Sequence, residues 1–152
     1  MDTILFSLVL FFAAPPQQEP NEHLKPLAWL EGSWVGTGKY GEVEMEDRIT
    51  YTLTHGGHFL QLKAVARMGG QVVQSGSGMI GYDKAKNKLV MHTFFTSGEI
   101  GMTESLPSKE KNVWRFAVRI GVKQPWEDAR AIMTKVDRDT YTYVVQMKRG
   151  DE

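Results

Sequence analysis

The chain has no cysteine among its 152 residues, which excludes disulfide bonds, thiolate chemistry and metal sites with cysteine ligands. It also lacks an excess of charge of either sign, because 18 lysine and arginine residues balance 18 aspartate and glutamate residues. Nucleic-acid binding generally requires a concentrated basic surface. The sequence therefore predicts neither thiol chemistry nor a nucleic-acid partner.

One long apolar run is present, Ile4 to Ala14, and it is too short to span a bilayer comfortably as a helix. Its length is typical of a signal peptide, so we expect residues 1–14 to direct export to the periplasm or the medium, with no other membrane segment. The residues before the run carry no basic side chain and Pro15 follows the expected cleavage site. An uncleaved anchor and a buried first strand or helix are therefore alternatives. Residues 15–21 are rich in proline and glutamine and predict a disordered linker.

The remaining segment, 22–152, has the length of one domain and a strand-like pattern almost throughout. One short helical turn is expected within 22–31, where leucines recur every third residue. Residues 48–55 then alternate between apolar and polar side chains, and similar runs follow at 58–67 and 71–82. Gly-Gly pairs separate these runs, as expected for tight hairpins.

Two-residue turns fix which residues pair across each hairpin. The predicted pairs across the first turn are His55 with His58, Leu53 with Leu60, Tyr51 with Leu62 and Ile49 with Ala64. Those across the second are Ala66 with Val73, Ala64 with Ser75, Leu62 with Ser77 and Leu60 with Met79. One face of all three strands is then mainly apolar, and we expect it to line the interior of a barrel.

The polar loop 83–88 has an even number of residues, so the same reasoning extends to the next strand. It pairs Met79 with His92 and Ser77 with Phe94, which places His92 and Phe94 inside unless a bulge intervenes. Residues 113–120 alternate as well, with Trp114 on the apolar side. About nine strands in sequence predict an all-β, up-and-down antiparallel barrel of about 8–10 strands, preceded by the helical turn.

Gly32-Ser33-Trp34, after a short helical turn and at the start of the first strand, resembles the opening of lipocalin-like (calycin) barrels. The resemblance gives Gly32 and Trp34 a structural role and implies a basic residue lying across the tryptophan, for which Arg149 or Lys148 is placed suitably. Two further motifs, Gly57-His-Phe-Leu60 and Gly81-Tyr-Asp83, are similar to those of an uncharacterised bacterial family of exported lipocalin-like proteins.

The segment Gly32 to Gly38 also resembles the opening of nitrobindin, a haem-binding barrel. That family binds iron through a histidine late in the chain, whereas the last histidine here is His92. This difference disfavours haem, and no cofactor is expected.

Histidines were considered as metal ligands, because imidazole nitrogen is a common ligand. His55 and His58 flank a tight turn and are expected to face each other about 5 Å apart. Spacing indicates no third ligand, so no metal site is predicted.

No pattern in the sequence indicates catalysis, and we predict that the protein is not an enzyme. Ser75-Gly76-Ser77-Gly78 lacks the spacing of a nucleophile elbow. The acidic cluster Glu42, Glu44, Glu46 and Asp47 is interpreted as a solvated rim between strands.

Two functions remain. In the first, the barrel binds a small hydrophobic ligand of the fatty-acid or isoprenoid class, with an acidic head group near His92. The predicted ligand-binding residues are Tyr51, Leu60, Leu62, Met79, His92 and Phe94. In the second, aromatic side chains fill the barrel, and it acts through its surface as a partner-binding or accessory protein. The sequence does not identify a protein partner.

Overall fold

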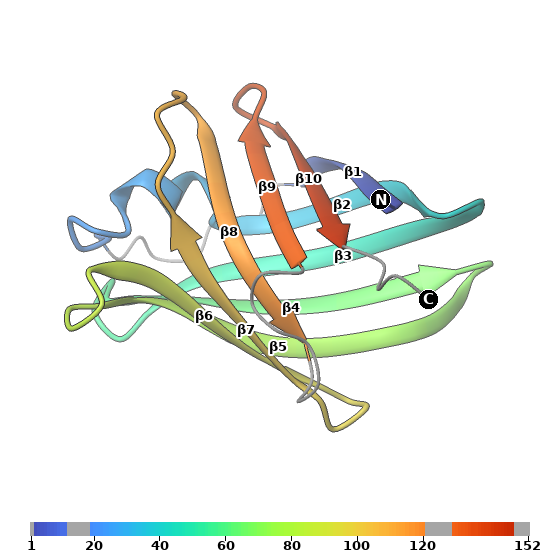
Figure 1. Ribbon diagram of the computed structural model, residues 1–152, viewed down its shortest axis with the longest axis horizontal. Helices are drawn as coiled ribbons and strands as arrows, with labels where there is room; N and C mark the ends of the chain where they lie inside the picture. Colours follow the sequence, from blue (N-terminus) through green and yellow to red (C-terminus); the bar gives the residue numbers. More distant parts are fainter. Residues whose placement is uncertain (1, 12–18, 121–128, 148–152) are drawn as a thin grey trace.

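The computed structural model describes residues 2–11, 19–120 and 129–147, most of which lie in antiparallel strands (Figure 1). The elements are β1 (Asp2–Phe11), the 3₁₀ helix η1 (Lys25–Leu30), β2 (Gly32–Tyr40), β3 (Val43–Thr54), β4 (Phe59–Met68), β5 (Gln71–Asp83), β6 (Lys88–Phe95), β7 (Ile100–Leu106), β8 (Val113–Ile120), β9 (Ala129–Lys135) and β10 (Thr140–Met147).

The strands form a closed barrel in which β2 to β10 follow one another around the wall in the order of the sequence. β1 lies between β2 and β10 and closes the ring, because it forms an antiparallel ladder with each of them. The prediction of an all-β, up-and-down, lipocalin-like barrel with a short N-terminal helical turn is confirmed.

β1 falls within the segment 1–14 that was predicted from the sequence to be a signal peptide. The ladders of β1 correspond to the alternative in which this segment is a first strand. Export remains a prediction.

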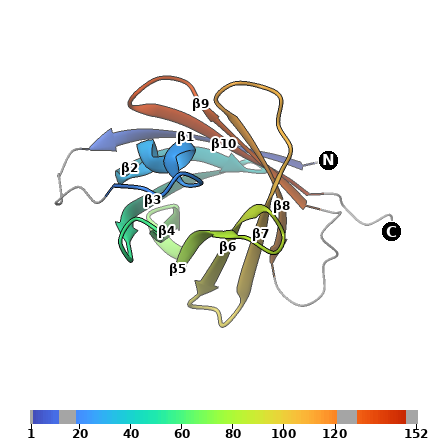
Figure 2. The ribbon, with the colours of Figure 1, turned by 90° about the vertical axis from the view of Figure 1, so that its left-hand side faces the viewer.

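η1 covers one end of the barrel, as the view along the barrel shows (Figure 2). Leu24, directly before η1, and Leu27 and Leu30 within it recur every third residue, which matches the three residues per turn of a 3₁₀ helix and aligns them on one face. These leucines are buried, and the list is Leu24, Leu27 and Leu30. The Asn21 carboxamide oxygen accepts hydrogen bonds from the backbone N–H groups of His23 and Leu24 and so fixes the entry to η1. Within the described residues, no helix has the length and hydrophobicity needed to cross a membrane.

The pairing of β3 with β4 agrees with the sequence prediction. Leu53 pairs with Leu60 and Tyr51 with Leu62, and all three leucines are buried. The connecting turn is longer than predicted, since Thr54 and Phe59 form the last pair and residues 55–58 lie outside the ladder. The register is unchanged because the turn grew by one residue on each side.

The pairing of β4 with β5 differs from the prediction by one residue. The Gly69-Gly70 turn forms as expected, with both glycines at positive φ. A β-bulge between Ala66 and Arg67 shifts the register, so that Leu62 pairs with Gly78 and not with Ser77. Because successive residues of a strand face opposite sides, the bulge reverses the facing of β5. The prediction that Ser75, Ser77 and Met79 occupy the inward positions is therefore wrong, and Gly76, Gly78 and Ile80 occupy them.

The reversal passes to β6. Met79 pairs with His92 and Ser77 with Phe94, as predicted, but these pairs belong to the outer face of the barrel. Phe94 is 56% exposed and His92 is also exposed, whereas Thr93 between them is buried. The inward placement of His92 and Phe94 is thus corrected, and the cause is the bulge one hairpin earlier.

Candidate functional site: the barrel cavity

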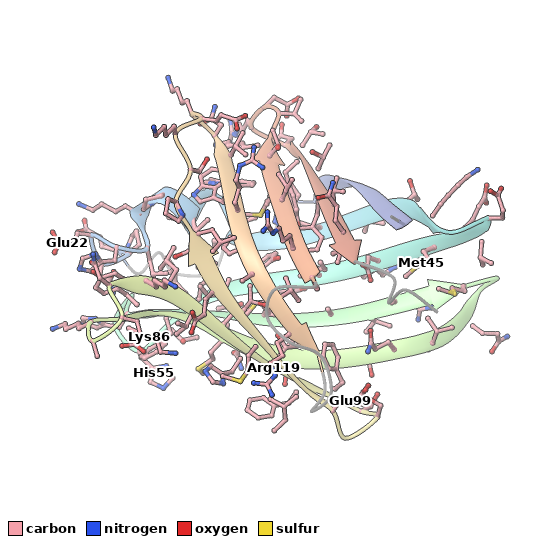
Figure 3. The ribbon with its side chains drawn as sticks, in the orientation of Figure 1. Glu22, Met45, His55, Lys86, Glu99 and Arg119 are labelled. Carbon is pink, nitrogen blue, oxygen red and sulfur yellow. The ribbon has the colours of Figure 1, made fainter. Side chains whose placement is uncertain are left out.

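The barrel encloses a cavity of about 550 Å³. Leu27 and Leu30 of η1 line it at one end, and Met45 lines it toward the opposite end. Figure 3 shows this direction, with Glu22, His55 and Lys86 at the end that η1 covers and Met45 farther along the barrel. The other lining residues include Ile49, Tyr51, Leu62, Ala64, Ala66, Gly76, Met91, Phe116, Met133, Tyr141 and Tyr143.

Small residues at inward positions explain the space. Ala64 and Ala66 of β4 pair with Gly76 and Gln74 of β5, so three of these four positions carry at most a methyl group. The bulge contributes directly, because it turns Gly76 and not a serine toward the interior. The cavity is therefore a consequence of side-chain size along two neighbouring strands.

Asp47 is the one charged residue among the described residues that line the cavity. It lies on β3 in step with Ile49 and Tyr51, and the alternation of the strand turns it inward. Its partners on the neighbouring strands are Gly36 and Ala66, which leave the carboxylate uncovered on both sides. Within the described part of the chain, no side chain donates a hydrogen bond to this carboxylate or forms an ion pair with it.

Burial without a counter-ion raises the pKa of the Asp47 carboxyl from 3.8 to about 6. Desolvation is the cause, because an apolar lining disfavours the charged form. The interpretation of Asp47 as part of a solvated acidic rim is therefore wrong. Glu44 and Glu46 lie on the same strand as Asp47, on either side of Met45, and point away from the cavity. Glu46 accepts a hydrogen bond from Arg48 at 2.8 Å.

Three tyrosines lie near Asp47 in the cavity wall, Tyr51 of β3 and Tyr141 and Tyr143 of β10. Burial raises the pKa of Tyr51 to about 12, and it raises the pKa of Tyr141 and Tyr143 as well. The Asp47 charge adds to the shift at each of the three hydroxyls, while the Tyr51 and Tyr141 hydroxyls are hydrogen-bonded to each other. The titratable groups of the described cavity lining are thus one carboxylate and three neutral phenols.

Trp34 lies beneath η1 and is 1% exposed, and its indole N–H donates a hydrogen bond to the Leu30 carbonyl at 2.7 Å. Gly32 has a φ of 131°, which glycine adopts without strain. Trp34 and Trp29 pack edge to face, with ring centroids 5.8 Å apart, and Lys135 places its ammonium 4.9 Å from the Trp29 ring. The predicted basic residues Arg149 and Lys148 lie outside the described residues.

The predicted ligand-binding residues separate into three groups. Tyr51 and Leu62 line the cavity, and Leu60 is buried beside it without lining it. Met79, His92 and Phe94 lie on the outer face. The expected interaction of an acidic head group with His92 in the interior therefore has no structural basis.

None of the four histidines lines the cavity. His55 is hydrogen-bonded to Thr54 and His58 to Asn21, so the two do not form the metal clasp that their spacing allows. Among the described residues, no group of three or more histidine, aspartate or glutamate side chains is arranged to hold a metal ion. A histidine-ligated haem has no candidate ligand in this cavity.

Asp47, Tyr141 and Tyr143 are the titratable cavity residues that the sequence reasoning did not assign to a site. A signal for Asp47 was present, since it has the same parity along the strand as Ile49 and Tyr51. The strand was expected to begin after the acidic cluster, whereas β3 begins at Val43. Extending the alternation backward by a few residues identifies an inward carboxylate.

Comparison of the chain with protein-family models gave no match, and comparison with curated proteins gave none either. The cavity is therefore the main indication of function.

Proposed function

We propose that this protein binds a small, largely apolar molecule inside its barrel, in the manner of the lipocalin-like barrels that its opening motif resembles. The observation that carries the proposal is the cavity of about 550 Å³, which lies within the usual range for small-molecule sites, roughly 300–1,000 Å³. Its lining is mainly aliphatic and aromatic side chains with a few polar groups, which is also typical of such sites.

The alternative was a barrel filled by its own aromatic side chains and acting through its surface. Two observations favour the first function over this one. Phe94, which was predicted to point inward, lies on the outer face, and Trp114 packs against Trp29 at the η1 end with ring centroids 5.5 Å apart. Neither side chain is among those that line the cavity.

We also propose export, on the strength of the apolar segment Ile4 to Ala14. Its strand pairing gives the alternative a concrete form, since cleavage after Ala14 would remove β1 from between β2 and β10. N-terminal sequencing of the protein from the extracytoplasmic fraction distinguishes the two. A start between Pro15 and Glu22 supports a cleaved signal, and an intact Met1 in the cytosol contradicts export.

Ligand binding is tested by titrating the purified protein with a neutral, environment-sensitive naphthalene fluorophore. Ala64→Phe fills the cavity from β4, and we expect it to weaken binding at least about tenfold because the probe loses its space. Val65→Phe is the matched control, since it adds an aromatic ring at the next residue, on the outer face.

Thermal melts of both variants establish that each is folded before binding is compared. Saturable binding to the wild type and to Val65→Phe, but not to Ala64→Phe, supports the site. Absence of saturable binding to the wild type contradicts a ligand-binding barrel and leaves the accessory-protein alternative.

A further inference from the structure

The charge inside the cavity has one sign. The described lining carries a single carboxylate, Asp47, and no basic side chain. Resting on the ligand-binding function proposed above, we propose that the cavity selects apolar molecules that carry one protonated amine, with the ammonium group bound at Asp47 and the apolar part along the barrel. This specifies the chemical class of ligand and the residue that recognises it.

The surroundings of Asp47 leave the carboxylate accessible to a ligand. Gly36 and Ala66 flank it across the sheet, and neither side chain reaches over it. Arg48, the next residue along β3, does not neutralise it, because its side chain faces outward and is bound to Glu46. A buried carboxylate without a partner is unfavourable, so a cation that reaches it gains the full strength of a charge-assisted hydrogen bond.

The tyrosines suit the same ligand. Tyr51, Tyr141 and Tyr143 line the same cavity as the carboxylate, whose charge acts on each of their hydroxyls. The faces of aromatic rings attract cations at short range. Their hydroxyls stay neutral at physiological pH, since burial raises the pKa of each. The neutral hydroxyl oxygens can therefore accept hydrogen bonds from an ammonium group, and they add no charge to the cavity.

A fatty acid is the wrong ligand for this lining. Its head group would approach the Asp47 carboxylate in an environment of low polarity, where like charges repel strongly. His92, which the sequence predicted as the partner of an acidic head group, lies on the opposite side of the sheet. The same apolar tail with an amine in place of the acid reverses the sign of this interaction.

The proposal has a pH dependence. No titratable side chain faces Asp47 from β2 or β4, where its neighbours are Gly36 and Ala66, and from β10 it is faced by Tyr141 and Tyr143. β1 carries one titratable residue, Asp2, which pairs with Met147 at the end of the ladder. In the empty cavity Asp47 takes up a proton near pH 6, so amine binding should weaken as the pH falls through this range.

The experiment compares three probes with one tail: dodecylamine, dodecanol and dodecanoate. Binding to the wild type, Asp47→Asn and Glu44→Gln is measured by calorimetry at about pH 7.5 and about pH 5, with each probe below its micellar concentration. Glu44→Gln is the matched control, because it removes the same charge from the outer face of the same strand. Thermal melts show whether each variant is folded.

We expect the wild type to bind dodecylamine at least about tenfold more tightly than dodecanol at neutral pH, which corresponds to one charge-assisted hydrogen bond. Asp47→Asn should reduce the amine to the level of the alcohol and leave the alcohol unchanged, and Glu44→Gln should change neither. If dodecanol binds as tightly as dodecylamine to the wild type, the amine preference is refuted while the cavity function stands. If no probe binds to the wild type, both the amine preference and the proposed ligand-binding function are refuted. The comparison at about pH 5 needs no variant, and an undiminished amine preference there would exclude Asp47 as the anchor.

Discussion

Replacing Asp47 with asparagine should make the empty protein more stable at neutral pH, although the substitution removes a native interior group. The carboxylate is ionised above about pH 6, half-buried, and without a hydrogen-bond or ion-pair partner among the described residues. Asparagine has nearly the same shape and carries no charge, so it avoids the desolvation of an ion. A substitution that normally destabilises a protein is therefore expected to stabilise this one.

The size of the effect follows from the pKa of Asp47, which burial raises from 3.8 to about 6. Well below pH 3.8 the carboxyl is protonated in both the folded and the unfolded state, and it does not weaken the fold. As the pH rises toward 6, the unfolded state loses its proton first, so stability falls and then levels off. A shift of about two units corresponds to about 3 kcal/mol at neutral pH. Water in the cavity screens part of this, and we expect about 1–2 kcal/mol.

Urea unfolding followed by tryptophan fluorescence measures the difference directly. At about pH 7.5 the midpoint of Asp47→Asn should lie above that of the wild type, and the gap should shrink at about pH 4.5. Glu44→Gln, on the outer face, should show no such gain. If Asp47→Asn is instead less stable at about pH 7.5 than the wild type, the carboxylate has a favourable partner in the folded state and the reasoning about the cavity fails.

Three further predictions concern the organisation of the η1 end and are tested by chemical denaturation. Trp34→Ala should cost about 3–5 kcal/mol, because it removes a fully buried indole, and an unchanged midpoint would contradict its central role. Lys135→Gln should cost about 0.5–1 kcal/mol by removing the cation over Trp29, and no loss would mean that this contact is too solvated to contribute. Gly57→Ala should lower the stability more than Gly56→Ala. Both glycines have positive φ, but only at position 57 would the added methyl overlap the backbone of the segment before η1. Equal losses of stability would show that this segment moves aside freely.

Where alternation and short turns are unambiguous, the sequence sufficed to predict the pairing of strands. The partners of Tyr51 and Leu53 follow from the Gly56-Gly57 turn, and the pairing of Met79 with His92 follows from the even-numbered loop after Tyr82. In each case the hydrophobic pattern and the turn length agree, so only one register satisfies both. The short helix before Gly32 was predictable for the same reason, since three leucines at a spacing of three have one common face.

The facing of β5 and β6 was not predictable from the pattern alone. Opposite the bulge between Ala66 and Arg67, β5 reads Val72-Val73-Gln74-Ser75. This run alternates weakly and is consistent with either register. The residues that decide the matter, Gly76 and Gly78, have no side chain and so give no signal of polarity. The bulge therefore reversed the placement of His92 without leaving a mark in the sequence.

The interior carboxylate at Asp47 conflicts with the rule that buried charges are paired, and such conflicts in natural proteins tend to lie at functional sites. Its unfavourable free energy in the empty barrel is available to a ligand. An ammonium group bound at Asp47 would lower the pKa of that carboxyl again, because a nearby positive charge favours the ionised form. Ligand binding would then recover the stability that the bare carboxylate removes, so the residue that weakens the empty barrel is the one that strengthens the occupied barrel. A neutral apolar ligand fills the same space without this gain, and for that reason Asp47 can distinguish ligands that the rest of the lining treats alike.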